Sequence, residues 1–128
     1  MDPRTTAEQY LAALSSGDPA AVVDLVTEDF ENEHTSELGS GLRGRANYAA
    51  RLPGFLAQFA ALQYEVVESI AEGDRVAVRY RLTANFEGKP LDIPGVMLFH
   101  VVDGQIARRT DIWDSLTFLR QTGAVEEG

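Results

Sequence analysis

The chain has 128 residues, of which 45% are hydrophobic and 24% are charged, and it carries a formal net charge of −9. This length and composition fit one folded domain spanning residues 1–128 and exclude an extended disordered protein. The negative charge argues against nucleic acid and membrane surfaces as partners, because binding to either needs clustered Lys and Arg side chains.

Processing and targeting signals are weak in this sequence. There is no cysteine, so no disulfide framework points to secretion. The first residues, MDPRTTAEQY, lack the apolar core of a signal peptide, and no apolar run approaches the length needed to cross a membrane. We therefore expect a soluble cytoplasmic protein.

Helical periodicity dominates the first half of the chain. Residues 5–15 have apolar side chains at spacings of three and four, and a second helix is expected to run from Asp18 to about Glu28. Residues 30–35 are compatible with a short strand. A third helix is expected over roughly residues 45–61, with Pro53 bending it or shifting its start.

From residue 62 onward the hydrophobic pattern has period two, which is typical of strands. The turn sequences Gly73-Asp74, Glu87-Gly88-Lys89 and Asp103-Gly104 separate four such segments. The expected strands begin near residue 64 and cover residues 75–86, 90–102 and 105–113, with a short helix at 115–120. The sequence therefore predicts an α+β domain, in which three N-terminal helices pack on a curved, mostly antiparallel sheet whose concave face can hold a ligand.

Three sequence segments carry a resemblance to a known superfamily. They are Tyr10 followed by LAALSSGD and then LVTEDF, the glycine-led GLRGRANYA, and DGQIARRTDIWDSLTFLRQTG at 103–123. Together they resemble the nuclear-transport-factor-2-like superfamily, which includes SnoaL-like polyketide cyclases, limonene epoxide hydrolases and ketosteroid isomerases. The resemblance covers about residues 8–123 and implies a cone-shaped, cystatin-like barrel. It says less about function, because this fold hosts many chemistries.

Asp111 is the first candidate catalytic residue. It lies five residues after Ile106, as does an aspartate on the last strand of the epoxide hydrolases, and alternation puts Arg109, Asp111 and Trp113 on one face. Trp113 matches a substrate-facing tryptophan of the ketosteroid isomerases, which implies that this face is concave. A carboxylate in an apolar pocket is often functional. The alternative is a buried structural ion pair between Asp111 and Arg109.

His34 is the second candidate. By resemblance it occupies the position of the aspartate base of ketosteroid isomerases and of a water-orienting asparagine of epoxide hydrolases, and imidazole accepts protons near physiological pH. Asn32 lies two residues earlier on the same face. The alternative is a half-exposed structural histidine in an acidic segment. His100 alternates with apolar residues, is expected to face outward and is given no role.

Neither related catalytic set is complete. Tyr10 matches the oxyanion-binding tyrosine of ketosteroid isomerases, but we favour the alternative, a core aromatic on an amphipathic helix. Met97 stands where those enzymes carry a protonated aspartate. The Arg–Asp pair of the epoxide hydrolases also has no counterpart, because Arg79 and Arg81 are expected to point outward.

We therefore expect a cofactor-independent acid–base enzyme acting on a hydrophobic, oxygenated small molecule, as an isomerase, cyclase or epoxide hydrolase. The alternative is a non-catalytic ligand-binding or partner-binding domain. No metal site is indicated. A homodimer is expected through the outer sheet face, which carries Val96, Leu98 and Ile112. The residues expected to line the pocket are Tyr10, Leu14, Asn32, His34, Phe55, Phe59, Tyr80, Leu82, Ile93, Met97, Phe99, Arg109, Asp111 and Trp113.

Overall fold

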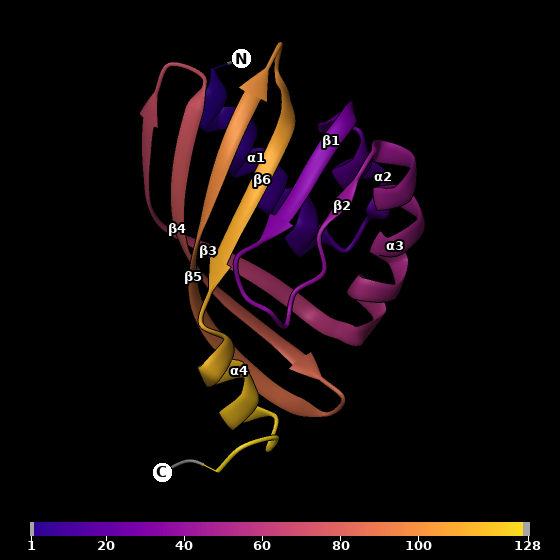
Figure 1. Ribbon diagram of the computed structural model, residues 1–128, viewed down its shortest axis with the longest axis vertical. Coiled ribbons are helices and arrows are strands. Elements are labelled where there is room, and N and C mark those ends of the chain that lie inside the picture. The colour runs from indigo at the N-terminus through magenta and orange to yellow at the C-terminus, as the bar shows by residue number, and fades with distance from the viewer. Residues whose placement is uncertain (1, 127–128) are drawn as a thin grey trace.

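One six-stranded sheet, with helices packed against it, forms the framework of the computed structural model, which describes residues 2–126 (Figure 1). None of the helices in these residues is long and apolar enough to cross a membrane. The elements are α1 (Pro3–Ser16), α2 (Pro19–Val23), β1 (Val26–His34), β2 (Leu42–Arg43), α3 (Arg45–Gln58), β3 (Phe59–Glu72), β4 (Arg75–Phe86), β5 (Lys89–Val102), β6 (Gln105–Trp113) and α4 (Ser115–Gln121).

The strands lie in the order β2-β1-β6-β5-β4-β3. Strands β3 to β6 form an antiparallel meander, whereas β1 pairs with β6 in parallel and with β2 in antiparallel orientation. The prediction of an α+β fold with a mostly antiparallel sheet is confirmed. The sheet is open, with β2 and β3 as its edges.

Alternation in β4 explains how the sheet acquires a buried face. Val76, Val78 and Tyr80 are almost fully buried, while Arg79 and Arg81 are exposed. The hairpin that follows is built on Glu87 and Gly88, which have φ angles of 52° and 81°. Two successive positive φ angles are the hallmark of the tight turn that matches the twist of antiparallel strands.

Helix α1 covers one end of the concave sheet face. The Asp2 side chain caps its start by accepting a hydrogen bond from the Thr5 N–H, and Gly17 ends it with a φ of 75°. Tyr10 on its buried side packs edge-on against Phe99 of β5, with ring centroids 5.7 Å apart. The other end of the concave face, beside α3, is left free of α1 (Figure 1).

The boundary between α2 and β1 differs from the prediction. The helix ends at Val23 and a strand begins at Val26, whereas the sequence pattern favoured a helix to Glu28. Val26 pairs with Ile106 of β6, and the Ile106 N–H donates to the Leu25 carbonyl at 2.7 Å. This pairing joins segments about eighty residues apart, and tertiary pairing of this kind overrides local propensity.

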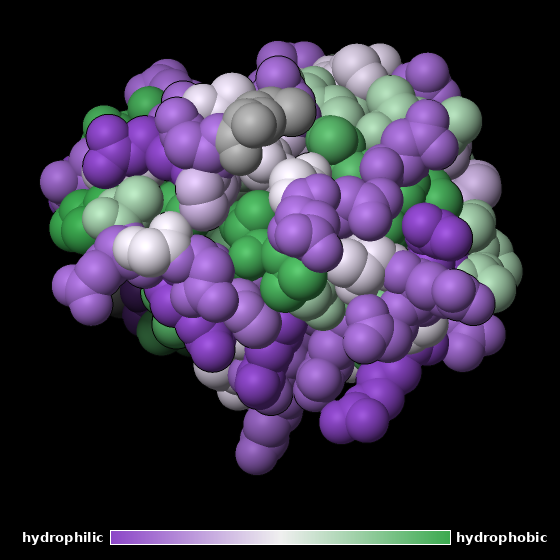
Figure 2. Space-filling model, turned by 90° about the horizontal axis from the view of Figure 1, so that it is seen from above, coloured by the Kyte–Doolittle hydropathy of each residue, from purple (hydrophilic) through white to green (hydrophobic). Residues whose placement is uncertain are grey.

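The end of the molecule that carries the N-terminus is mostly polar at its surface. Seen from above, hydrophilic residues cover most of this end, and hydrophobic residues gather in a patch near the centre of the view (Figure 2).

The largest fully buried side chains include Tyr10, Phe30 and Phe99. The core therefore lies between α1 and the sheet.

Candidate functional site

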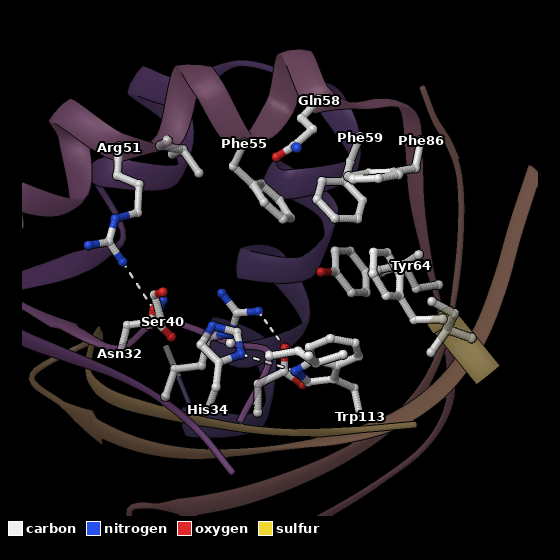
Figure 3. A pocket seen from close by; sticks show the side chains of 18 of the residues that line it. Asn32, His34, Ser40, Arg51, Phe55, Gln58, Phe59, Tyr64, Phe86 and Trp113 are labelled. Carbon is white, nitrogen blue, oxygen red and sulfur yellow. Dashed lines mark hydrogen bonds and ion pairs between the residues drawn. The ribbon is translucent and has the colours of Figure 1, made fainter. Parts of the chain in front are cut away.

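A cavity of about 610 Å³ lies between α3 and the concave face of the sheet (Figure 3). Its volume is within the range of small-molecule pockets. The polar residues that line it are Asn32, His34, Ser40, Arg51, Gln58, Arg109 and Asp111. Apolar and aromatic residues make up most of the remaining lining: Leu38, Tyr48, Leu52, Phe55, Phe59, Tyr64, Tyr80, Leu82, Phe86, Ile93, Trp113 and Phe118.

Asp111 is the one carboxylate among the described residues that line this cavity, and it is only 4% exposed. Its Oδ1 accepts a hydrogen bond from the Tyr80 hydroxyl at 2.6 Å, and its Oδ2 accepts one from Arg109 Nη2 at 2.8 Å. Charge-assisted bonds of this kind are stronger than neutral ones. The carboxylate is therefore held by one partner on each oxygen.

Arg109 extends the network away from the cavity. Its Nη1 donates to the Tyr10 hydroxyl at 3.1 Å, and that hydroxyl is also hydrogen-bonded to the Tyr48 hydroxyl. Within the described residues, two buried polar atoms of this region lack a hydrogen-bond partner, Arg109 Nε and Asn32 Oδ1. Arg109 Nε is a donor and Asn32 Oδ1 is an acceptor, and both residues line the cavity.

His34 lies next to Asp111 in the sheet, because the two residues are register partners on β1 and β6. They are not hydrogen-bonded to each other in the described structure; instead, His34 Nδ1 accepts from the Trp113 indole Nε1 at 3.2 Å. Burial lowers the pKa of His34 below its ordinary value, and the charge of Arg109 lowers it further, while Asp111 partly opposes this. The imidazole is therefore neutral near pH 7.

Tyr48, Tyr64 and Tyr80 remain protonated phenols. Burial raises the pKa of Tyr80, and the negative charge of Asp111 raises it further. Burial is also the main cause of the raised pKa of Tyr48 and of Tyr64. A neutral phenol can donate a hydrogen bond. Tyr80 therefore donates to the Asp111 carboxylate and adds no negative charge beside it.

The cavity brings together most of the residues that the sequence singled out. Asn32, His34, Phe55, Phe59, Tyr80, Arg109, Asp111 and Trp113 all line it. Tyr10, Leu14, Met97 and Phe99 do not, which corrects the predicted lining. The physical reason is α1, which packs on the part of the concave face where Met97 and Phe99 lie. Tyr10 reaches the site through its hydrogen bonds with Arg109 and Tyr48, which both line the cavity.

Several lining residues were missed. Arg51, Gln58 and Tyr64 belong to none of the motifs that carry the resemblance. Nothing in their local sequence indicates that they line a cavity. The contact between Tyr80 and Asp111 did leave a signal, namely Gly95 in the middle of a strand, which often indicates close approach of another group. A Cβ at Gly95 would collide with the Tyr80 ring and hydroxyl.

Metal binding has little support in the geometry. In residues 2–126 no group of three or more His, Asp or Glu side chains is placed to hold a metal ion. The donor set around the cavity consists of one carboxylate already bound to Arg109 and one imidazole bonded to Trp113. Such a set can bind, orient and exchange protons with an organic ligand.

Comparison with solved structures shows the fold. A protein with a ketosteroid-isomerase-like fold from Catenulispora acidiphila, in complex with trimethylamine, has a TM-score of 0.84, with 18% identity over 92% of each chain. A protein assigned as a polyketide cyclase from Xanthomonas campestris pv. campestris has a TM-score of 0.81, with 24% identity over 93% of this chain and 95% of that one. An LEH-like epoxide hydrolase from M. tuberculosis has a TM-score of 0.81, with 21% identity over 94% and 91%.

These identities are too low to transfer an activity, and no curated protein sequence matches the chain. The family is nevertheless clear from the sequence itself. The model of the SnoaL-like domain matches residues 7–109, which is most of the chain and runs from within α1 to the middle of β6. The chain therefore belongs to the SnoaL-like domain family.

Proposed function

We propose that this chain is a small-molecule enzyme that acts on a hydrophobic, oxygenated substrate by general acid–base catalysis without a cofactor. The observation that carries the proposal is the position of Asp111, a buried carboxylate in the wall of a cavity otherwise rich in aromatic and aliphatic side chains. Converging polar groups in such a cavity are the usual arrangement of a catalytic or binding site.

Asp111 is the proposed base. A carboxylate has about four lone-pair sites, and Tyr80 and Arg109 use one on each oxygen. The remaining lone pairs can take a proton from a carbon next to a carbonyl group, which leaves an enolate, or from a water molecule that then attacks an electrophilic carbon. Returning the proton to another carbon of the enolate completes an isomerisation. In a ring closure the enolate carbon attacks a second carbonyl carbon of the same molecule, and the proton goes to the alkoxide oxygen that forms. In an epoxide opening the attack of water breaks a C–O bond of the ring, and the proton goes to the released oxygen.

The surrounding groups suit this role. Tyr80 and Arg109 fix the orientation of the carboxylate, and fixed geometry is a large part of the advantage that an active site has over solution. The fold neighbours include a protein assigned as a polyketide cyclase and an LEH-like epoxide hydrolase, which supports cyclase or hydrolase chemistry. Departures from optimal stability, such as the unpaired Arg109 Nε, are also typical of functional sites.

The test is a turnover screen with three substrate classes: epoxides, β-keto polyketide mimics and unsaturated ketones. Each is incubated with the wild-type chain, with Asp111→Asn and with Asp92→Asn. Asp92 is an exposed carboxylate of β5 that pairs with Arg81, so its variant controls for loss of charge on the sheet. We expect turnover in the wild type and in Asp92→Asn, with a loss of at least a hundredfold in Asp111→Asn. Turnover that survives in Asp111→Asn would remove Asp111 as the base.

A second function is favoured by a specific observation. Both oxygens of Asp111 already accept hydrogen bonds, from Tyr80 and from Arg109. This is what we would expect of a structural ion pair in the cavity wall of a ligand-binding domain. In that case small molecules would raise the melting temperature of the chain without being converted. The increase would also persist in the Asp111→Asn variant.

A further inference from the structure

The hydrogen bond between Trp113 and His34 determines which nitrogen of the imidazole carries the proton. An indole N–H can only donate, so His34 Nδ1 must accept with its lone pair. A neutral imidazole has one protonated nitrogen, which leaves the proton on Nε2. Burial keeps the ring neutral by lowering its pKa, with the charge of Arg109 as the second cause.

Contacts on the other side of the ring hold this orientation. Gly39, in the loop between β1 and β2, packs so closely on His34 that a Cβ there would collide with Cβ and Cγ of the histidine. Arg51 of α3 fastens the same loop, because its Nη1 donates to the Ser40 carbonyl at 3.0 Å. The ring is therefore held between this loop and Trp113, as Figure 3 shows from the cavity side.

The second nitrogen, Nε2, has no hydrogen-bond partner among the described residues, although His34 lines the cavity. The two nitrogens of an imidazole point in different directions, so Nε2 is turned away from Trp113. The charged groups near the ring are Asp111 and Arg109 on the neighbouring strand β6 and Arg51 on α3. Asp111 accepts from Tyr80 and Arg109 instead of from His34.

We propose that His34 is a hydrogen-bond donor to the ligand and not a general base: its Nε2–H binds a carbonyl, epoxide or enolate oxygen of a molecule in the cavity. This reverses the role that the sequence suggested for this residue. A neutral imidazole donor polarises a carbonyl group and stabilises the oxygen as negative charge develops on it.

The two proposed roles belong to residues on adjacent strands, the hydrogen-bond donor His34 on β1 and the base Asp111 on β6. His34 and Asp111 are register partners, so their side chains emerge side by side into the cavity. A ligand carbonyl bound to Nε2–H would have its neighbouring C–H near the Asp111 carboxylate. The inference shares its cavity with the proposed function, and it names the ligand class as one with an acceptor oxygen attached to an apolar body.

The first experiment measures the proton position directly. Nitrogen-15 NMR of histidine-labelled protein at about pH 8 distinguishes the two neutral tautomers, since protonated and bare ring nitrogens differ widely in shift. The chain has only two histidines, so His100→Gln assigns the signals of His34. We expect a protonated Nε2 and a bare Nδ1 whose shift changes in Trp113→Phe. A proton on Nδ1 would overturn the proposal.

The second experiment measures binding without turnover. Acetophenone and its hydrocarbon isostere α-methylstyrene are titrated against the wild type, His34→Leu and His34→Gln, following the indole N–H signal of Trp113, the only tryptophan in the chain. The affinity ratio of ketone to hydrocarbon should fall about fivefold in His34→Leu, because one hydrogen bond is worth about 1 kcal/mol. It should be largely kept in His34→Gln, which retains an N–H donor.

An unchanged ratio in His34→Leu would overturn the proposal. The tautomer measurement needs no substitution of His34, so it stands even if a substitution at His34 disturbs folding. Neither measurement requires catalysis. A chain without turnover that shows both results would therefore contradict the proposed enzyme function and leave the donor role of His34 in place.

Discussion

The Tyr80 hydroxyl reaches Asp111 by passing over Gly95, which lies on the strand between them. Tyr80 is on β4, Asp111 is on β6, and Gly95 on β5 is the register partner of Tyr80. The hydrogen bond of 2.6 Å is possible because glycine has no side chain in the path of the ring. A strand glycine thus determines which partner the buried carboxylate has.

Gly95→Ala should therefore destabilise the chain, even though alanine is normally more stable than glycine within a strand. The added methyl group collides with the Tyr80 ring and with the Ile112 carbonyl, and overpacking of this kind costs about 1–3 kcal/mol. The free energy of unfolding from urea titration measures the effect.

Gly54→Ala is the matched control. Gly54 lies within α3, and a Cβ there meets nothing within 4 Å. Alanine should stabilise this helix by about 0.5–1 kcal/mol. If Gly95→Ala were as stable as the wild type, the close passage of Tyr80 over this position would not exist in solution.

Local patterns predicted the second half of the chain well. The strands at 75–86 and 105–113 have the bounds expected from alternation and from turns with glycine, because a hairpin is specified by residues that are near in sequence. The first half was harder. Val22, Val23, Leu25 and Val26 fit a helix as well as a strand, and the pairing with Ile106 that decides between them is distant in sequence.

In the site too, the features set by local sequence could be predicted and those set by distant contacts could not. Alternation along β6 was enough to place Arg109, Asp111 and Trp113 on one face, and all three line the cavity. It could not show how far α1 extends over that face, so Met97 and Phe99 were wrongly expected in the lining. The ion pair between Asp111 and Arg109 could be anticipated, because the two residues are two apart on one strand. The bonds of Asp111 with Tyr80 and of His34 with Trp113 join residues that are distant in sequence, which no local pattern contains.

Arg109→Met should be strongly destabilising. It leaves the Asp111 carboxylate buried without its cation, and breaking a buried pair from one side costs about 3–5 kcal/mol. The double variant Arg109→Met/Asp111→Leu should recover much of the loss, because no unpaired charge remains. Arg81→Met is the control, since its pair with Asp92 is exposed and its loss should change stability little. Additive losses in the double variant would contradict a direct pair.

The outer sheet face is proposed to form a homodimer. Leu98 and Ile112 lie on the neighbouring strands β5 and β6, on the outer face of the sheet, and are 43% and 42% exposed, which is unusual for large apolar side chains on a sheet. Leu98→Glu should convert a dimer into a monomer in light scattering coupled to size exclusion. Leu116→Glu on α4, 49% exposed in the wild type, should not. A wild-type chain that is already monomeric would contradict the proposal.

His34 should make stability depend on pH in a defined direction. Its pKa in the folded chain is lowered from 6.5, first by burial and then by Arg109, so between the folded value and 6.5 the unfolded chain binds a proton that the folded chain does not. Stability contributed by the neutral ring is present above about pH 6.5 and is lost as the pH falls through the folded pKa.

The measurement compares the free energy of unfolding of the wild type and His34→Gln at about pH 8 and about pH 5. The wild type should lose more stability than the variant on acidification, because only the wild type must protonate an imidazole that then cannot accept from Trp113. The control is made in the background of His100→Gln, which removes the outer-face histidine bonded to Asp74. The double variant His34→Gln/His100→Gln should differ from His100→Gln as His34→Gln differs from the wild type, because the contact of His34 with Trp113 is the same in both backgrounds. Parallel pH curves for the wild type and His34→Gln would show that His34 is solvated in the native state and not held against Trp113.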